Sequence, residues 1–135
     1  MLSEQDFMRY VAAFNLGDKD AYGSFYSPDI RFQNGAGACL EGPDAIIAYY
    51  EQLKGRIARK MEVRSVIAGE NALCASLHSR FEIIAPAEQF AGEMLRKGDT
   101  VLLESMALYE LDKDRFRCIA AKSLSRQIIR AETRA

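Results

Sequence analysis

His78 is the only histidine of this chain, and histidine is the side chain that titrates near neutral pH without help from its surroundings. His78 is therefore a candidate general base, and Glu104 could serve with it as an alternative acid/base pair. Cys74 lies four positions before His78 on one expected strand, which separates the two side chains by about 13 Å. A nucleophile and its base must be within hydrogen-bond reach, so the sequence assigns no catalytic residue.

Two other polar side chains stand where a ligand could meet them. Tyr10 belongs to an apolar helical stripe, and its hydroxyl could donate a hydrogen bond to a ligand oxygen or could reach a polar neighbour within the core. Asn34 ends an expected strand and could orient a ligand carbonyl, although Asn-Gly is also favourable turn chemistry. Both interpretations stay open at each position.

The sequence does not indicate a site for a metal, a nucleotide or nucleic acid. One histidine and three scattered cysteines match no zinc spacing, so neither a metal nor a cofactor is expected. The Gly35-Ala36-Gly37 segment lacks the Lys-Ser/Thr that follows a phosphate-binding loop. With 18 Lys and Arg against 19 Asp and Glu, the net charge is −1, which does not favour binding to nucleic acid.

Length and composition indicate one globular domain. The chain has 135 residues, of which 49% are hydrophobic and 27% are charged. We expect a single domain over residues 1–126 and a C-terminal tail over 127–135. No apolar run approaches the about 18 residues of a membrane span, and the N-terminus lacks a signal pattern. Three widely spaced cysteines favour a reduced protein, so a cytoplasmic location is expected.

The elements that must position these side chains begin with two helices. Ser3 can cap the first helix, and Gly17 suits its left-handed C-terminal cap. Asp18 can cap a second, shorter helix, which Ser27-Pro28 ends. The apolar stripe of the first helix follows the spacing i, i+3, i+4 and i+7 and consists of Phe7, Tyr10, Val11 and Phe14.

A short strand and a third helix follow. Alternating polarity predicts a strand over residues 29–34, and Asn34-Gly35 is a strong turn signal. Pro43 stands where the first residue of a helix is expected. The apolar face of this third helix would consist of Ile46, Tyr49, Tyr50, Leu53 and Ile57.

Beyond residue 60 the hydrophobic period changes to two. Strands are predicted over 61–69, 72–84, 100–111 and 115–126, and short polar connections predict antiparallel hairpins. The connection 85–98 is longer. In that connection, Phe90 and Met94 could cover the mouth of a pocket, or could simply be two packed residues of a surface loop. Helices followed by an antiparallel sheet indicate an α+β fold with the helices on one sheet face.

The alternation of the strands predicts which side chains face the helices. In the strand 72–84 the odd positions should face the helices, so His78 and Arg80 should face outward. In the last strand, Phe116 is placed outward and Ile119 inward. A β-bulge would reverse these assignments and bring His78 and Glu104 inside. Because both faces carry apolar groups, we expect a homodimer through the outer face.

Three segments carry a family resemblance. Residues 9–18 (RYVAAFNLGD), 25–29 (FYSPD) and 42–50 (GPDAIIAYY) resemble the nuclear transport factor 2-like superfamily, and the similarity runs over about residues 5–125. That group includes ketosteroid isomerases, SnoaL-like polyketide cyclases, scytalone dehydratase and limonene epoxide hydrolase. The resemblance implies an α+β, cystatin-like cone, with three N-terminal helices packed in a curved antiparallel sheet, an apolar pocket inside and usually a dimer. The fold hosts many activities.

The resemblance also implies positions for site residues. The oxyanion tyrosine of the ketosteroid isomerases falls on Tyr10, their catalytic base on Asn34 and their second aspartate near Ala107. An amide cannot abstract a proton from carbon and an alanine donates nothing, so that mechanism is not expected. The inward arginine and two aspartates of limonene epoxide hydrolase are also not found on the strands. The implied pocket consists of Tyr10, Asn34, Tyr49, Leu77, Ser79, Phe81, Ser105, Ala107 and Ile119.

Three functions remain open on these grounds. The first is binding of a small apolar molecule that carries oxygen, in the interior of the cone. The second is a cyclase, isomerase or dehydratase acting on a polyketide-like or terpenoid substrate, with Tyr10 polarising a carbonyl and His78 or a carboxylate moving the proton. The third is a dimerising accessory domain that takes no ligand. Neither nucleic acid nor a membrane is an expected partner.

Overall fold

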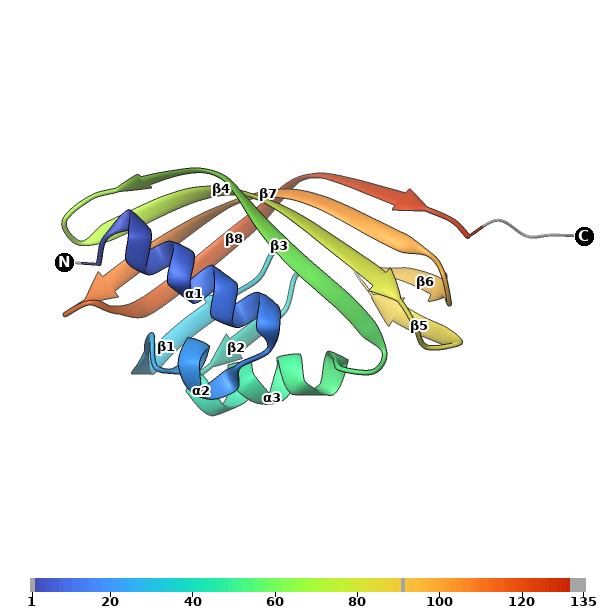
Figure 1. Cartoon of the computed structure of the whole chain (residues 1–135), viewed down its shortest axis with the longest axis horizontal. Coiled ribbons are helices and arrows are strands. Elements are labelled where there is room, and N and C mark those ends of the chain that lie inside the picture. The colour runs from blue at the N-terminus through green and yellow to red at the C-terminus, as the bar shows by residue number, and fades with distance from the viewer. Residues whose placement is uncertain (1, 91, 132–135) are drawn as a thin grey trace, which may run out of the picture.

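A curved sheet of six strands arches over three helices that lie on its concave side (Figure 1). The computed structural model describes residues 2–90 and 92–131. In chain order the elements are α1 (Glu4–Leu16), α2 (Lys19–Gly23), β1 (Tyr26–Gln33), β2 (Cys39–Glu41), α3 (Pro43–Leu53), β3 (Ile57–Ala68), β4 (Ala72–Ile83), β5 (Ala87–Phe90), β6 (Glu93–Arg96), β7 (Thr100–Asp112) and β8 (Arg115–Ile129).

The strand order in the large sheet is β2-β1-β8-β7-β4-β3. The α+β class and the packing of helices inside a curved sheet are confirmed. The expectation of a wholly antiparallel sheet is wrong at one pairing, because β1 runs parallel to β8. These two strands lie far apart in sequence, so no hairpin dictates their relative direction.

Helix α1 forms as its sequence predicts. The Ser3 hydroxyl accepts a hydrogen bond from the Asp6 amide at 3.1 Å, and the Asp6 carboxylate accepts one from the Ser3 amide at 3.0 Å. Gly17 ends the helix in the left-handed region at φ 71°. The predicted stripe is buried, and the rings of Phe7 and Tyr10 pack against Tyr109 of β7 and Phe116 of β8.

The other two helices are shorter than predicted. Helix α2 ends at Gly23, and Tyr26 already belongs to β1. Helix α3 ends at Leu53, and a turn through Gly55, at φ 83°, leads into β3 at Ile57. Strand β3 therefore begins four residues before the predicted start at 61, and Ile57 faces the core from a strand rather than from a helix.

Three short strands were not predicted. Strand β2 pairs with β1 and closes the turn that begins at Asn34. Strands β5 and β6 form a separate hairpin within the connection 85–98, at one end of the arch (Figure 1). Elements of three or four residues are too short to display a period of two, so their sequences carry little signal.

The last strand continues into the predicted tail. Strand β8 runs to Ile129, so 127–129 belong to the sheet, while 132–135 lie outside the described residues. Asp99, just before β7, forms hydrogen bonds with the residues that follow β8. Its carboxylate accepts hydrogen bonds from the backbone amides of Arg96 and Ala131, both at 2.8 Å, and from the Arg130 guanidinium at 3.2 Å.

The predicted facing of the strands holds on β4 and β7 and fails at one point of β8. The odd positions of β7 from Val101 to Leu111 are buried. Phe116, placed outward by the sequence, is fully buried because the pairing of β7 with β8 shifts register between Glu110 and Leu111. Its ring centroid lies 4.9 Å from that of Tyr10. A bulge that the alternation does not reveal thus adds an aromatic ring to the core.

Two general features bear on the expected setting of the protein. Over residues 2–90 and 92–131, no helix combines the length and the apolar character needed to cross a bilayer. Cys39, Cys74 and Cys118 are all free thiols.

Candidate functional site

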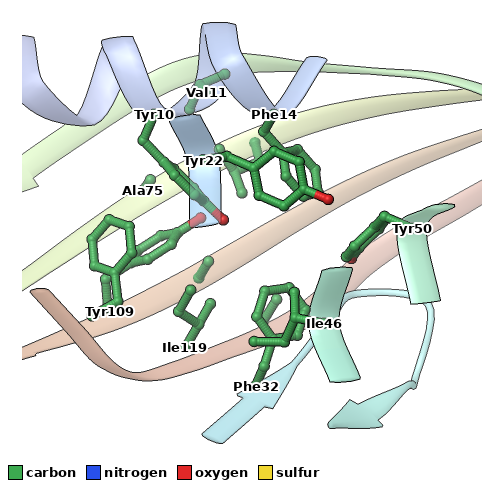
Figure 2. Close-up of a cluster of buried hydrophobic side chains, with 14 of the residues drawn as sticks. Tyr10, Val11, Phe14, Tyr22, Phe32, Ile46, Tyr50, Ala75, Tyr109 and Ile119 are labelled. Atoms are coloured by element: carbon green, nitrogen blue, oxygen red, sulfur yellow. The ribbon is translucent and has the colours of Figure 1, made fainter. Parts of the chain in front are cut away.

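A cavity lies between the helices and the concave face of the sheet. Its volume is about 70 Å³, and the empty space is about 700 Å³ when the open solvent at its mouth is included. Figure 2 shows how Tyr10 and Phe14 from α1, Tyr50 from α3 and Phe32 from β1 converge in this region. Eight of the nine predicted pocket residues line the cavity, namely Tyr10, Asn34, Tyr49, Leu77, Ser79, Phe81, Ser105 and Ile119.

Ala107 is the predicted pocket residue that does not line the cavity. It is buried on the concave side of β7, between Ala75 of β4 and Ala121 of β8 in register. Ser105 and Tyr109 on the same strand do line the cavity, as does Ala121 beside it. Ala107 thus shares the predicted face without contributing to the cavity wall.

His78 and Glu104 form a pair on the outer face of the sheet. They are direct cross-strand neighbours, and the His78 Nδ1 lies 2.5 Å from a Glu104 carboxylate oxygen. Neither residue lines the cavity. The bulge that would have turned them inward is not present between β4 and β7, whose pairing is regular from Ala72 to Glu82. The alternative acid/base pair therefore forms, but away from the interior.

Two buried tyrosines share a hydrogen bond at one wall of the cavity. The hydroxyl oxygens of Tyr10 and Tyr26 are 2.8 Å apart. Burial raises the pKa of both hydroxyls well above the ordinary tyrosine value, so both stay protonated at neutral pH. Two hydroxyls that share one hydrogen bond leave one proton to donate elsewhere. Tyr10 is therefore a core residue and a wall of the cavity at once.

The Asn34 side chain forms hydrogen bonds both within its own turn and to Tyr50. Its side-chain oxygen accepts hydrogen bonds from the amides of Ala36 at 3.1 Å and Ala38 at 2.9 Å, as an Asn-Gly turn predicts. Its side-chain nitrogen donates to the Tyr50 hydroxyl at 3.0 Å. The Tyr50 oxygen accepts this bond, so its own proton is available for a ligand. Burial raises the Tyr50 pKa, which keeps that proton in place.

Arg59 is a site residue that the sequence analysis missed, as it missed Tyr50. It lines the cavity from β3, and its guanidinium carbon lies 3.8 Å from the Phe14 ring centroid and 4.5 Å from that of Tyr50. Its Nη2 donates to the Phe14 carbonyl at 3.0 Å. Its Nη1 is buried and has no hydrogen-bond partner among the described residues. Burial lowers the Arg59 pKa, but arginine stays charged at neutral pH.

The correct start of β3 would have revealed Arg59. Alternation from Ile57 through Arg59 to Met61 places all three side chains on one face, and Ile57 is buried there. Because the strand was expected to begin at 61, residue 59 was assigned to the preceding segment and its facing was not considered.

A single side chain gives the cavity its charge. Among the described residues that line it, Arg59 is the one charged side chain, and none is Asp, Glu, His, Lys or Cys. Across the described parts of the chain, no cluster of three or more His, Cys, Asp or Glu could hold a metal ion. The cavity thus offers hydroxyl and guanidinium hydrogen-bond donors on apolar walls and no strong base.

The hairpin β5–β6 contributes one residue to the wall of the cavity. Phe90 lines the cavity, is buried, and packs with its ring centroid 4.7 Å from that of Phe81. Met94 is 63% exposed and does not line the cavity. Of the two residues proposed to cover the mouth, only Phe90 lines the cavity.

The family of the SnoaL-like domain matches residues 7–119. No curated protein matches the chain. An epoxide hydrolase from M. tuberculosis, similar to limonene epoxide hydrolase, superposes with a TM-score of 0.69 at 14% identity, covering 87% of this chain and 78% of its own.

Two further solved structures show the same fold. A candidate polyketide cyclase from Xanthomonas campestris has a TM-score of 0.71 at 18% identity, and the match covers 86% of this chain and 85% of that one. A computationally designed 17-OHP binder has a TM-score of 0.68 at 9% identity, with 90% and 94% covered. At these identities the likeness establishes the architecture and leaves the chemistry to be argued from the cavity itself.

Proposed function

Because this chain belongs to the SnoaL-like domain family, within the nuclear transport factor 2-like superfamily, we propose that its cavity binds a small apolar molecule that carries oxygen. The observation that carries this proposal is the composition of the walls. Phe14, Leu77 and Leu103 supply apolar surface, while Tyr50 has a hydroxyl proton to donate. Apolar walls with a few placed donors are typical of small-molecule sites.

The size of the cavity limits the ligand. A volume of about 70 Å³ holds several waters and is smaller than the about 150 Å³ of a cavity that encloses benzene. We therefore expect compact ligands, part of whose body extends into the open space at the mouth of the cavity. Small ketones, lactones and phenols are suitable probes.

Thermal stabilisation by such a panel tests the proposal. A ligand that binds the folded state raises the melting temperature as its concentration rises. The variant Ser79→Leu fills the cavity from β4 and should abolish the shift. The matched control is Ser76→Leu, which changes the same strand on its outer face, opposite Met106, and should keep the shift. If no panel member shifts the wild type, the proposal of a ligand site fails.

Catalysis is the second candidate function. The candidate polyketide cyclase from Xanthomonas campestris has a similar fold, and the Tyr10–Tyr26 pair is able to polarise a carbonyl. A proton transfer from carbon requires a base, and His78 lies on the other face of the sheet. Mass spectrometry of incubated ligands separates the two functions. Unchanged ligands support binding, whereas conversion of any ligand by the wild type would support the enzyme.

A further inference from the structure

Arg59 carries a charge for which the fold provides no counter-charge. Within residues 2–90 and 92–131, no Asp or Glu side chain forms an ion pair with it. The groups that act on it electrostatically are the neighbouring tyrosines Tyr50, Tyr22, Tyr10 and Tyr26, all neutral hydroxyls at neutral pH. Arg59 is partly buried and its Nη1 is fully buried, and a charge removed from water without a partner is costly, so its presence requires an explanation.

Stacking explains the position of the guanidinium but not its hydrogen bonds. Phe14 and Tyr50 lie against its faces, whereas its N–H groups point outward in its own plane. One of these donors is satisfied by the Phe14 carbonyl. The Nη1 group remains buried without an acceptor. The protein thus holds a planar cation in place and leaves one edge of it unsatisfied beside a cavity that it lines.

We propose that the ligand of this cavity is an organic monocarboxylate, whose carboxylate pairs with the Arg59 guanidinium while its apolar body occupies the cavity. This inference rests on the proposed ligand-binding function and specifies the class of ligand. A carboxylate supplies the in-plane acceptor that Nη1 lacks and the negative charge that the cavity lacks. The Tyr50 hydroxyl proton is a further donor on the same wall.

The single charge also decides which anion fits. A phosphate brings up to two negative charges and three strong acceptor oxygens, and it would enter a cavity with one cation and mostly apolar walls. Its uncompensated charge would have to leave water without a partner. A monocarboxylate brings one charge, which one guanidinium neutralises.

Pairs of ligands that differ only in charge test the inference. Benzoate and hexanoate are compared with benzamide and hexanamide by isothermal titration calorimetry. We expect the wild type to bind each carboxylate about 10- to 100-fold more tightly than its amide, as a hydrogen bond between charged partners requires. In Arg59→Met this preference should vanish, because the two ligands of each pair then meet no positive charge in the cavity. Arg59→Lys should restore part of the preference.

Controls separate a role in binding from a role in folding. Arg64→Met removes an exposed arginine from the same strand and should leave the carboxylate preference intact. Without ligand, Arg59→Met should melt no lower than the wild type, because it removes a partly buried charge that no carboxylate compensates. A lower melting temperature together with an unchanged carboxylate preference would show that Arg59 is only a structural stack and would overturn the inference.

The outcomes also distinguish this inference from the proposed function. If the wild type binds benzamide as tightly as benzoate, the carboxylate inference is wrong and the cavity remains a site for neutral ligands. If neither these probes nor the ketones, lactones and phenols bind, the proposed function itself fails and the inference fails with it.

Discussion

Tyr10 and Tyr26 illustrate how much depends on single hydroxyl groups in this core. Both rings are about 2% exposed, and their hydroxyl oxygens are 2.8 Å apart. Each hydroxyl is the hydrogen-bond partner of the other in a part of the core that is closed to solvent. The energetic value of such a pair lies less in the bond itself than in the cost of leaving one partner alone.

A double-mutant cycle measures that cost. Tyr10→Phe leaves the Tyr26 hydroxyl buried without its partner and should lower the free energy of unfolding by about 1–3 kcal/mol. The double variant Tyr10→Phe/Tyr26→Phe removes both hydroxyls and should be more stable than the single variant. Urea unfolding of the four proteins checks both statements. Additive losses would mean that the two hydroxyls are not coupled.

At the scale of residues, the sequence predicted the facing of side chains where strands alternate regularly. Leu77, Ser79 and Phe81 line the cavity because β4 pairs regularly with β7 along this stretch. Phe116 was assigned to the wrong face because a bulge between β7 and β8 leaves no mark in the local pattern. Arg59 was overlooked because the start of its strand was misplaced by four residues, although its alternation with Ile57 was present in the sequence.

Asp99 shows how one carboxylate holds together the ends of two elements. It lies just before β7 and accepts hydrogen bonds from Arg96 at the end of β6 and from Ala131 after β8. The backbone amide of Ala131, followed by that of Arg96, lowers the pKa of this carboxylate below its ordinary value. A carboxylate with a lowered pKa in the folded state stabilises that state whenever it is ionised.

The variant Asp99→Asn should reveal this as a pH-dependent loss of stability. The stabilisation is fully present above the unfolded pKa, about 4, and is lost as the pH falls through the lower folded value. The wild type should therefore be more stable than the variant at neutral pH, and the difference should shrink in acid below about pH 4. Chemical unfolding across pH measures it. The control Glu70→Gln, in an exposed turn, should show no such convergence.

At the scale of elements, length decided what could be predicted. Helix α1 and strands β4 and β7 are long enough for their periods to be unambiguous. Strand β2 forms by pairing with β1, and β5 and β6 form by pairing with each other. Their sequences of three or four residues are too short to show a hydrophobic period. The parallel pairing of β1 with β8 depends on the assembled sheet, which no local pattern encodes.

The convex outer face of the sheet has no helix over it (Figure 1). On β7, Met106 is 40% exposed and Leu108 is 44% exposed, and the His78–Glu104 pair lies on the same face. We propose that a second copy of this chain covers this face. A net charge of −1 offers little repulsion between copies, and apolar side chains beside a polar pair suit an interface.

Substitution of Leu108 by glutamate tests this association. Sedimentation velocity of the wild type should show a dimer, and Leu108→Glu should shift the protein toward the monomer because it buries an unpaired charge at the interface. Leu16→Glu is the control, since Leu16 is 82% exposed at the end of α1, which lies on the opposite, concave side of the sheet (Figure 1). A wild type that sediments as a monomer at every concentration would exclude the dimer.

The parallel pairing of β1 with β8 has a consequence for how the chain is made. Phe32 on β1 is in register with Ile119 on β8, about ninety residues later. During synthesis, β1 leaves the ribosome long before β8, the strand that it pairs with in the middle of the sheet. The aromatic side chains of α1 stay incompletely packed for the same time, because Tyr10 packs against Phe116 of β8. The loop that closes on this pairing is long, so its formation is a late and entropically costly event. A nascent chain that stalls before β8 exposes its half-built core, which makes it a natural client for molecular chaperones.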